Sequence, residues 1–282
     1  MSKLPSIFYH SEYLAIQGHK KLKVFETDDF KVAFALVKDL AVSLPQGLFG
    51  SIEKKKRAVN FPAFEAFWKE VHGALKEEKI NRAEIIHPPE IYAGYVPFAW
   101  LGEVGFSRMY ADINHHIALK DFQLHKMEEK KLKQLARLKF TTEKLPATEL
   151  KATYDFLNDC REEKGLKLNV TYDRLVALFE AYPDRYDIFM CYLDGAPASA
   201  VVTIKVAPDV VYYFLPGTLE SAKQHSPMVG LLAEIVKHFS KTHTYLDLGV
   251  SSIEGKPQAG LITFKERMGG IAATKPRYFA KV

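Results

Sequence analysis

Apolar residues in the first quarter of the chain follow two periods, one typical of helices and one typical of strands. In residues 28–42 and 61–79 they recur every three or four positions, which predicts two amphipathic helices. Residues 13–25 and 83–87 read as strands, the second ended by a pair of prolines. Proline and glycine in residues 43–50 separate the two helices. This quarter therefore predicts the order strand, helix, helix, strand.

The middle of the chain predicts a strand at residues 106–119 and a basic helix at 126–139 with a leucine-rich face. Helices follow at 148–164 and 171–182, the first ended by Gly165.

Three strands follow in succession. The Asp194-Gly195 pair predicts a hairpin between residues 186–193 and 198–206, and Pro208-Asp209 turns the chain into a strand at 210–215. An antiparallel sheet is therefore expected at the centre of this half.

The C-terminal quarter predicts a helix that begins with Ser226 as the cap residue and Pro227 at the first helical position. A buried strand from Tyr245, a helix from Gly260 and a closing strand at 274–280 follow. Loops at the carboxyl end of a strand are free to vary while the sheet stays rigid, so the loop after Leu248 is the favoured site.

Composition restricts the class of protein. The 282 residues are 48% apolar and 26% charged, which suits a globular chain of one large or two ordinary domains. Charges interrupt every apolar run before the length of a membrane span, and Met-Ser-Lys-Leu-Pro-Ser lacks a secretory apolar region, so a cytoplasmic protein is expected. The net charge of +5 permits an anionic partner without requiring one.

The metal-ligating and thiol residues are few. Cys160 and Cys191 are interpreted as buried small hydrophobes rather than a disulfide. His115 and His116 point to opposite faces if they lie in a strand, so no metal site is expected.

Several polar residues near the favoured loop have two interpretations. Asp247, within an apolar strand, is either a general base or a buried acceptor for loop amides. His225 is either a proton-transfer group or an ordinary loop histidine. Lys265 lies either on a solvated helix face or near a reacting group. The run Tyr212-Tyr213-Phe214 is either strand packing or the lining of an acyl pocket.

Two segments carry a resemblance to a known family. A strand, then Gly249-Val-Ser251, then Phe264-Lys265 and Gly269 before a final strand resembles the last third of Fem-type aminoacyl and acyl transferases, which are built from GNAT-like domains. Ser107-Arg-Met-Tyr-Ala-Asp112, followed by the basic helix, is similar to the family's link between its halves. The resemblance implies an α+β fold of two tandem GNAT-like domains, 1–140 and 141–282, with mixed, mostly antiparallel sheets flanked by helices.

The resemblance also implies roles for residues. Lys265 would stabilise the charge that develops on a carbonyl oxygen, and Phe264 would pack against the end of the donor. The remaining substrate-binding candidates come from the strand ends and the helix start: Ser226, Gly230, Gly249, Ser251 and Tyr213.

The donor is left open. GNAT enzymes hold a diphosphate with a glycine-rich loop before the helix, but Pro227 and Val229 occupy those positions here, which weakens the case for acetyl-CoA. Fem-type enzymes lack that loop and use aminoacyl-tRNA, but the helical arm that tRNA-dependent members often carry is not visible. We therefore expect no tightly bound cofactor, with acyl-CoA or aminoacyl-tRNA as the co-substrate.

The leading hypothesis is a Fem-like transferase that moves an aminoacyl or acyl group to an amine, of a small molecule or a cell-envelope precursor. The first alternative is an N-acyltransferase that uses acyl-CoA, which predicts a CoA-sized groove at Ser226. The second is a non-catalytic module that binds RNA or protein, which predicts an occluded cleft.

Overall fold

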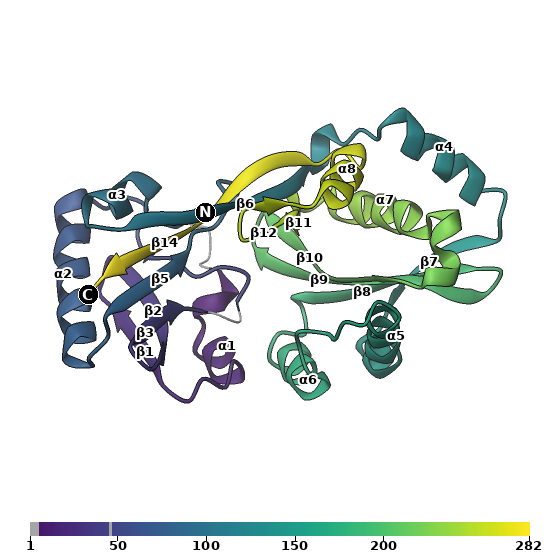
Figure 1. Ribbon diagram of the computed structural model, residues 1–282. Coiled ribbons are helices and arrows are strands. Elements are labelled where there is room, and N and C mark those ends of the chain that lie inside the picture. Colours follow the sequence, from purple (N-terminus) through teal and green to yellow (C-terminus); the bar gives the residue numbers. More distant parts are fainter. Residues whose placement is uncertain (1–5, 45–46) are drawn as a thin grey trace. The chain divides into compact units, whose positions relative to one another are not determined.

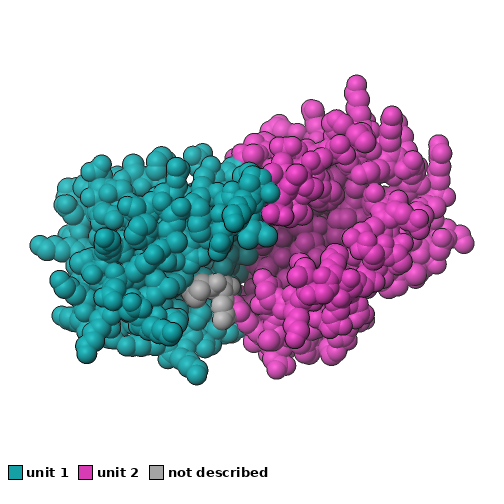
Figure 2. All heavy atoms as spheres, in the orientation of Figure 1, with its two compact units in different colours: residues 1–114, 252–257, 273–282 teal, residues 115–251, 258–272 magenta. Residues whose placement is uncertain are grey.

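The computed structural model describes residues 6–44 and 47–282 (Figure 1). It divides into two compact units, residues 1–114, 252–257 and 273–282 in the first and residues 115–251 and 258–272 in the second (Figure 2). Most of the N-terminal stretch used above to judge a secretory sequence, and part of the predicted break at 43–50, lie outside the described residues. Compactness alone does not define a folding domain, so the division into domains 1–140 and 141–282 stays a prediction.

The first unit is a sheet with one long helix packed on it. Its strands follow the order β1-β2-β3-β5-β14, and β4 pairs with β2. Phe30, Val32 and Phe34 of β2 share a hydrophobic core with Phe64 and Trp68 of the long helix α2. The elements of this unit are η1 Ile7–Tyr9, α1 Ser11–Ile16, β1 Leu22–Glu26, β2 Phe30–Val37, β3 Leu40–Ser43, β4 Glu53–Lys54, α2 Phe61–Glu77, β5 Arg82–Ile86, α3 Phe98–Glu103, β12 Ser252–Ile253 and β13 Lys256–Pro257.

The prediction of a helix at residues 28–42 is wrong. The segment forms the antiparallel pair β2 and β3, joined by a tight turn in which Lys38 has a positive φ of 56°. Both faces of β2 are buried, so its apolar residues satisfy a helical and an alternating pattern at once. The prediction of a strand at 13–25 is also partly wrong, because α1 occupies its first residues.

Two strands, β6 (Ser107–Ala118) and β14 (Ile271–Lys281), each begin in one unit and end in the other. The second unit has the strand order β11-β10-β9-β8-β7, in which β10 and β11 are parallel and the other pairs antiparallel. Helix α7 lies on one face of these strands, and α5 and α6 lie on the other (Figure 1). The remaining elements are η2 Leu119–Asp121, α4 Lys126–Leu135, β7 Phe140–Leu145, η3 Ala147–Glu149, α5 Leu150–Glu162, α6 Tyr172–Ala181, β8 Tyr186–Leu193, β9 Ala196–Ala207, β10 Val210–Thr218, η4 Glu220–His225, α7 Pro227–Phe239, β11 Tyr245–Val250 and α8 Ala259–Arg267.

Turn chemistry explains the parts of this unit that the sequence predicted well. Asp194 and Gly195 both have positive φ, 49° and 81°, as the hairpin between β8 and β9 requires. The basic helix, however, ends at Leu135 and not at residue 139, and β7 follows it. Pro227 is the first residue of α7 as predicted, but Ser226 makes no side-chain cap hydrogen bond because it adopts the left-handed conformation (φ 55°, ψ 46°).

The two cysteines are buried and unpaired, which confirms their interpretation as small hydrophobic residues. Burial raises the pKa of the Cys160 thiol to about 11 and that of Cys191 to about 12, so both stay protonated at neutral pH. Among the described helices, none has both the length and the apolar character needed to span a bilayer.

A buried carboxylate joins three strands of the second unit. Asp187 on β8 accepts Lys144 Nζ from β7 at 2.7 Å and Lys205 Nζ from β9 at 2.9 Å. Burial alone would raise the pKa of Asp187, but the hydrogen bonds from the two lysines outweigh it and lower the pKa below its usual range. The carboxylate therefore stabilises the folded state above the ordinary aspartate pKa, and this stabilisation is lost as the pH falls through the lowered value.

We expect Asp187→Asn to lower the free energy of unfolding by about 2 kcal/mol at pH 7, because the neutral amide offers the two lysines one acceptor oxygen and no charge. The difference from wild type should shrink below about pH 4, where the unfolded carboxylate is protonated. Chemical unfolding at the two pH values measures it. Asp155→Asn, which breaks an exposed pair with Lys151, is the matched control and should change stability by less than about 0.5 kcal/mol. Equal effects of the two variants would contradict the prediction.

Candidate functional site

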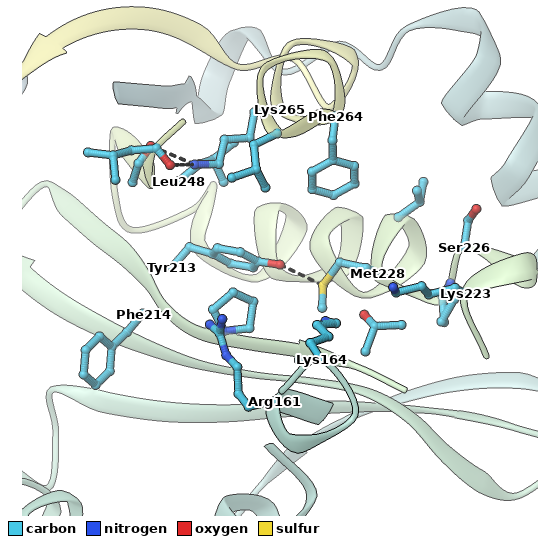
Figure 3. Close-up of a pocket in the computed structure, with 18 of the residues that line it drawn as sticks. Arg161, Lys164, Tyr213, Phe214, Lys223, Ser226, Met228, Leu248, Phe264 and Lys265 are labelled. Atoms are coloured by element: carbon cyan, nitrogen blue, oxygen red, sulfur yellow. Dashed lines mark hydrogen bonds between the residues drawn. The ribbon is translucent and has the colours of Figure 1, made fainter. Parts of the chain in front are cut away.

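A cavity of about 620 Å³ lies in the second unit, where β10 and β11 stop pairing. The two strands are in parallel register from Val210↔Tyr245 to Tyr212↔Asp247, whereas β10 stays paired with β9 as far as Thr218. Beyond the last shared pair, the cavity is lined by parts of β10, β11, α7 and α8 (Figure 3). Its volume lies within the range of small-molecule sites.

Lys265 forms part of the wall beside β11. It comes from α8, its exposed fraction is 6%, and its ammonium donates to the carbonyl oxygens of Gly249 at 2.8 Å and Val250 at 2.7 Å. A buried ammonium needs such acceptors to remain charged. The two carbonyls thus fix a positive charge at the carboxyl end of β11.

Gly249 lies between this charge and two further polar side chains, those of Tyr212 and Asp247. Its φ of 75° favours glycine, and a Cβ atom there would lie 2.7 Å from the Tyr212 hydroxyl. Its amide donates to Asp247 Oδ1 at 2.8 Å. Burial, and after it the charge of Asp247, raises the pKa of the Tyr212 phenol, which stays protonated. Tyr212 lines the cavity, as one of the two interpretations of the run Tyr212-Tyr213-Phe214 predicted.

Asp247 itself is buried and does not line the cavity. The structure thus gives it the hydrogen bond to a loop amide that one of its two interpretations required, while a role in proton transfer stays untested. Ser251 is also buried and outside the lining, and its hydroxyl lies 2.9 Å from His115 Nδ1. Burial, and after it the charge of Lys265, lowers the pKa of His115.

Tyr213 and Phe264 both line the cavity, Tyr213 from β10 and Phe264 from α8 (Figure 3). The Tyr213 hydroxyl donates to Met228 Sδ at 2.8 Å, and burial raises its pKa. Phe264 lies one residue before Lys265, on the cavity side of α8. The adjacent pair Phe264-Lys265 therefore faces the cavity with an apolar ring and a fixed charge.

The three candidates before and within α7 are separated by the structure. Ser226 lines the cavity, whereas His225 is exposed on η4 and does not. Gly230 is buried away from the cavity, and a Cβ atom there would lie 2.4 Å from the Phe140 ring. Gly230 thus permits close packing of α7 on β7, so a role in binding an anion stays an untested prediction.

Apart from Lys131, which lies in the predicted basic helix, sequence reasoning missed the basic residues of the cavity. Four cationic side chains line it in addition to Lys265, and among the described residues no Asp or Glu side chain does. They are Lys131 of α4, Arg161 of α5, Lys164 just after α5, and Lys223 of η4. Arg161 and Lys164 stand three positions apart before Gly165, a spacing that places them on one side of the chain, but nothing in the sequence showed which surface they face.

Comparison with known families identifies the class. Residues 124–262 match the model described as "Acetyltransferase (GNAT) domain", so this segment, which includes the cavity walls up to Leu261, is a GNAT domain. A search of curated proteins gave no match.

Solved structures extend the likeness to the whole chain. FemX matches with a TM-score of 0.70 and 12% identity over 100% of this chain and 94% of its own. The C-terminal domain of a putative lysylphosphatidylglycerol synthetase from Agrobacterium fabrum matches with a TM-score of 0.65 and 13% identity over 94% of this chain and 84% of its own. A tandem GNAT protein from the clavulanic acid biosynthesis pathway matches with a TM-score of 0.52 and 11% identity over 89% and 78%.

Residues 124–262 therefore belong to the GNAT acetyltransferase family, and the whole chain has the fold of FemX. This confirms the predicted α+β fold with tandem GNAT-like halves, and the prediction of an enzyme of the acyltransferase class. GNAT domains generally take acyl-CoA as a co-substrate without binding a cofactor tightly.

Proposed function

We propose that the chain transfers an acyl or aminoacyl group from an activated carrier to an amine, with the reacting carbonyl held between Phe264 and Tyr213, beside Lys265. The observation that carries this proposal is the buried ammonium of Lys265, fixed by two backbone carbonyls in the cavity wall. A charge fixed before the reaction needs no reorganisation when the substrate's charge develops.

The chemistry follows from the charge changes. The amine nitrogen attacks the carbonyl carbon and a negative charge develops on the carbonyl oxygen. The C–S or C–O bond to the carrier then breaks, and the carrier leaves as a thiolate or as an alkoxide that takes up a proton. The Lys265 ammonium stabilises the carbonyl oxygen, and the amine loses a proton as the new bond forms. Tyr212, which is protonated and lines the cavity, is our candidate for donating a hydrogen bond to the leaving group.

We propose that Asp247 accepts the proton, with His225 as the weaker candidate because it is an exposed loop histidine. We expect Asp247→Asn to lower kcat about 100-fold, the smaller end of the range for general acid-base groups. The asparagine oxygen still accepts the Gly249 amide, so stability should stay within about 1 kcal/mol of wild type. A stable variant with unchanged kcat would show that Asp247 only holds the loop.

The substrate class is a further proposal. The name of one structural neighbour, lysylphosphatidylglycerol synthetase, describes an aminoacyl product, and the resemblance to Fem-type enzymes favours an amine of a cell-envelope precursor as the acceptor. Neither the family match nor the cavity adds support for a tRNA-borne donor. We therefore keep both an aminoacyl ester and an acyl thioester as donors.

A specific observation favours the alternative of an acyl-CoA-dependent N-acyltransferase. The cavity reaches Ser226 at the start of α7, where that alternative predicted a groove. The left-handed Ser226, Pro227 and Val229 stand where a glycine-rich loop would bring amides to a diphosphate, which argues against the usual mode of CoA binding. The third hypothesis, a non-catalytic module, predicted an occluded cleft, and the cavity of about 620 Å³ disfavours it.

Calorimetric titration of acetyl-CoA, and then of aminoacyl-tRNA, into the full chain tests the proposal. Binding of either donor, followed by transfer to an added amine, would support it and identify the carrier. Saturable CoA binding with acetyl transfer and without tRNA binding would favour the N-acyltransferase. The absence of binding and transfer with both donors would count against the proposed function.

A further inference from the structure

The charge of the cavity is one-sided. Five basic residues line it and, within the part of the chain that the structure describes, no carboxylate lines it. The whole chain, by contrast, has 39 lysines and arginines against 34 acidic residues, so such a segregation is not a consequence of composition. Cations that line a concave surface concentrate positive potential there and attract anions.

The cations differ in how they are paired. Lys131 forms an ion pair with Glu128 at 2.8 Å, and Lys223 pairs with Glu220. Lys265 is held by backbone carbonyls. Among the described residues, no ion pair involves Arg161 or Lys164, although both lie in the wall. These two residues therefore have charge available for a ligand.

A glycine explains why the end of α5 reaches the cavity. Gly217 of β10 has no side chain, and a Cβ atom there would lie 2.7 Å from Leu157 Cδ2 and 3.2 Å from Cys160 Cβ. Helix α5 can therefore pack closely on the strand, so that Arg161, which follows Cys160, lies at the cavity. Figure 3 shows Arg161 and Lys223 approaching the cavity from different elements.

We propose that Arg161 and Lys164, with Lys223 across the cavity, form an anion subsite that binds a phosphate group of the substrate. The side chains of this subsite would take the place of the backbone amides that a glycine-rich loop offers to a diphosphate. At the start of α7, Pro227 and Val229 occupy the positions of those glycines. Arginine offers a fork of donors that matches phosphate oxygens, and lysine adds a point charge. The inference deepens the proposed function and rests on it only for the identity of the molecule that carries the phosphate.

Two sources share this chemistry, a phosphorylated donor such as CoA and a phosphorylated amine acceptor. The apolar part of the cavity, with Tyr213, Phe264 and Leu248, would then hold the rest of the molecule next to Lys265. The substrate class is in both cases an amphiphilic phosphate ester.

The test is calorimetric binding of inorganic pyrophosphate, and then of CoA, to the full chain and to Arg161→Gln/Lys164→Gln. We expect the Kd for pyrophosphate to rise at least tenfold in the double variant, and less in Lys223→Gln. Lys167→Gln is the matched control, because it removes a charge three residues from Lys164 on an exposed residue outside the lining, and it should change Kd less than twofold. Circular dichroism confirms that the variants are folded.

The outcomes separate the two claims. A tenfold loss of affinity for both pyrophosphate and CoA in the double variant supports the subsite and assigns the phosphate to the donor. A loss of affinity for pyrophosphate alone supports the subsite and assigns the phosphate to the acceptor. Unchanged pyrophosphate binding in the double variant, an equal loss in Lys167→Gln, or no pyrophosphate binding to wild type overturns the subsite. If pyrophosphate binding behaves as expected but no donor gives acyl transfer, the proposed function fails and the subsite stands.

Discussion

Lys265→Met is expected to lower kcat for acyl transfer by about 100- to 1,000-fold, the effect of removing one preorganised donor to a developing oxyanion. Methionine keeps the length of the side chain within α8 and removes the charge. Because the ammonium is proposed to act on the charge of the transition state, KM for the donor should change less than threefold. Steady-state kinetics with the donor identified by titration measures both constants.

The structural role of Lys265 must be separated from the proposed catalytic one. Its loss leaves the Gly249 and Val250 carbonyls without their donor, so we expect a cost of about 2 kcal/mol in stability. This loss of stability is the same with and without substrate. By itself it therefore does not lower kcat while leaving KM unchanged. Lys241→Met, a change of the same chemistry on an exposed turn, is the control and should leave kcat unchanged.

Two results would contradict the assignment. If Lys265→Met raised KM with kcat unchanged, the lysine would stabilise the bound substrate and the transition state equally and would contribute nothing to the chemical step. If kcat were unchanged in a folded variant, the ammonium would only fasten α8 to the end of β11. A loss of kcat that is also found in Lys241→Met would show that the assay responds to overall charge.

Local sequence signals predicted those parts of the fold in which a residue type is tied to a backbone conformation. Asp194-Gly195 fixed a hairpin, and Pro227 marked the start of α7. Buried surfaces gave no such signal. Strand β2 is apolar on both faces, and its turn at Lys38 lacks glycine, so its period was ambiguous.

The candidate site shows a similar division. Residues adjacent in the chain, such as Phe264 and Lys265, were identified together through a resemblance, and both line the cavity. Contacts between distant segments were not accessible: Tyr212 meets Gly249 across 37 positions, and Arg161 approaches β10 only because Gly217 leaves room for α5. Side-chain convergence depends on the packing of helices on the sheet, and the sequence period of a helix does not specify which of its polar residues face a cavity.

Among glycine-to-alanine changes near the site, we expect Gly269→Ala to lower the stability of the protein most. Gly269 follows α8 with a φ of 80°, and a Cβ atom there would lie 2.6 Å from the carbonyl oxygen of Gln123, a backbone atom that cannot turn away. We expect the left-handed strain to cost about 1 kcal/mol and the overpacking about 2 kcal/mol. The second unit should therefore lose about 3 kcal/mol of stability.

Gly165→Ala is the matched control. Gly165 follows α5 with a similar φ of 67°, but a Cβ atom there meets nothing within 4 Å, so this change should cost only the strain of about 1 kcal/mol. Tryptophan fluorescence is unsuitable, because Trp68 and Trp100 both lie in the first unit. Hydrogen exchange measured on peptides from α8 and β11 reports the second unit directly.

The comparison of the two alanine variants also tests the position of the site. Gly270, next to Gly269, donates its amide to the Lys265 carbonyl at 2.8 Å, so displacement of the chain after α8 moves the residue that carries the proposed catalytic charge. We therefore expect Gly269→Ala to speed exchange in α8 and to lower kcat at temperatures where the protein remains folded, whereas Gly165→Ala does neither. Equal exchange in the two variants would show that the Gln123 backbone yields to the added methyl group, and it would remove close packing at Gly269 as the reason for a glycine after α8.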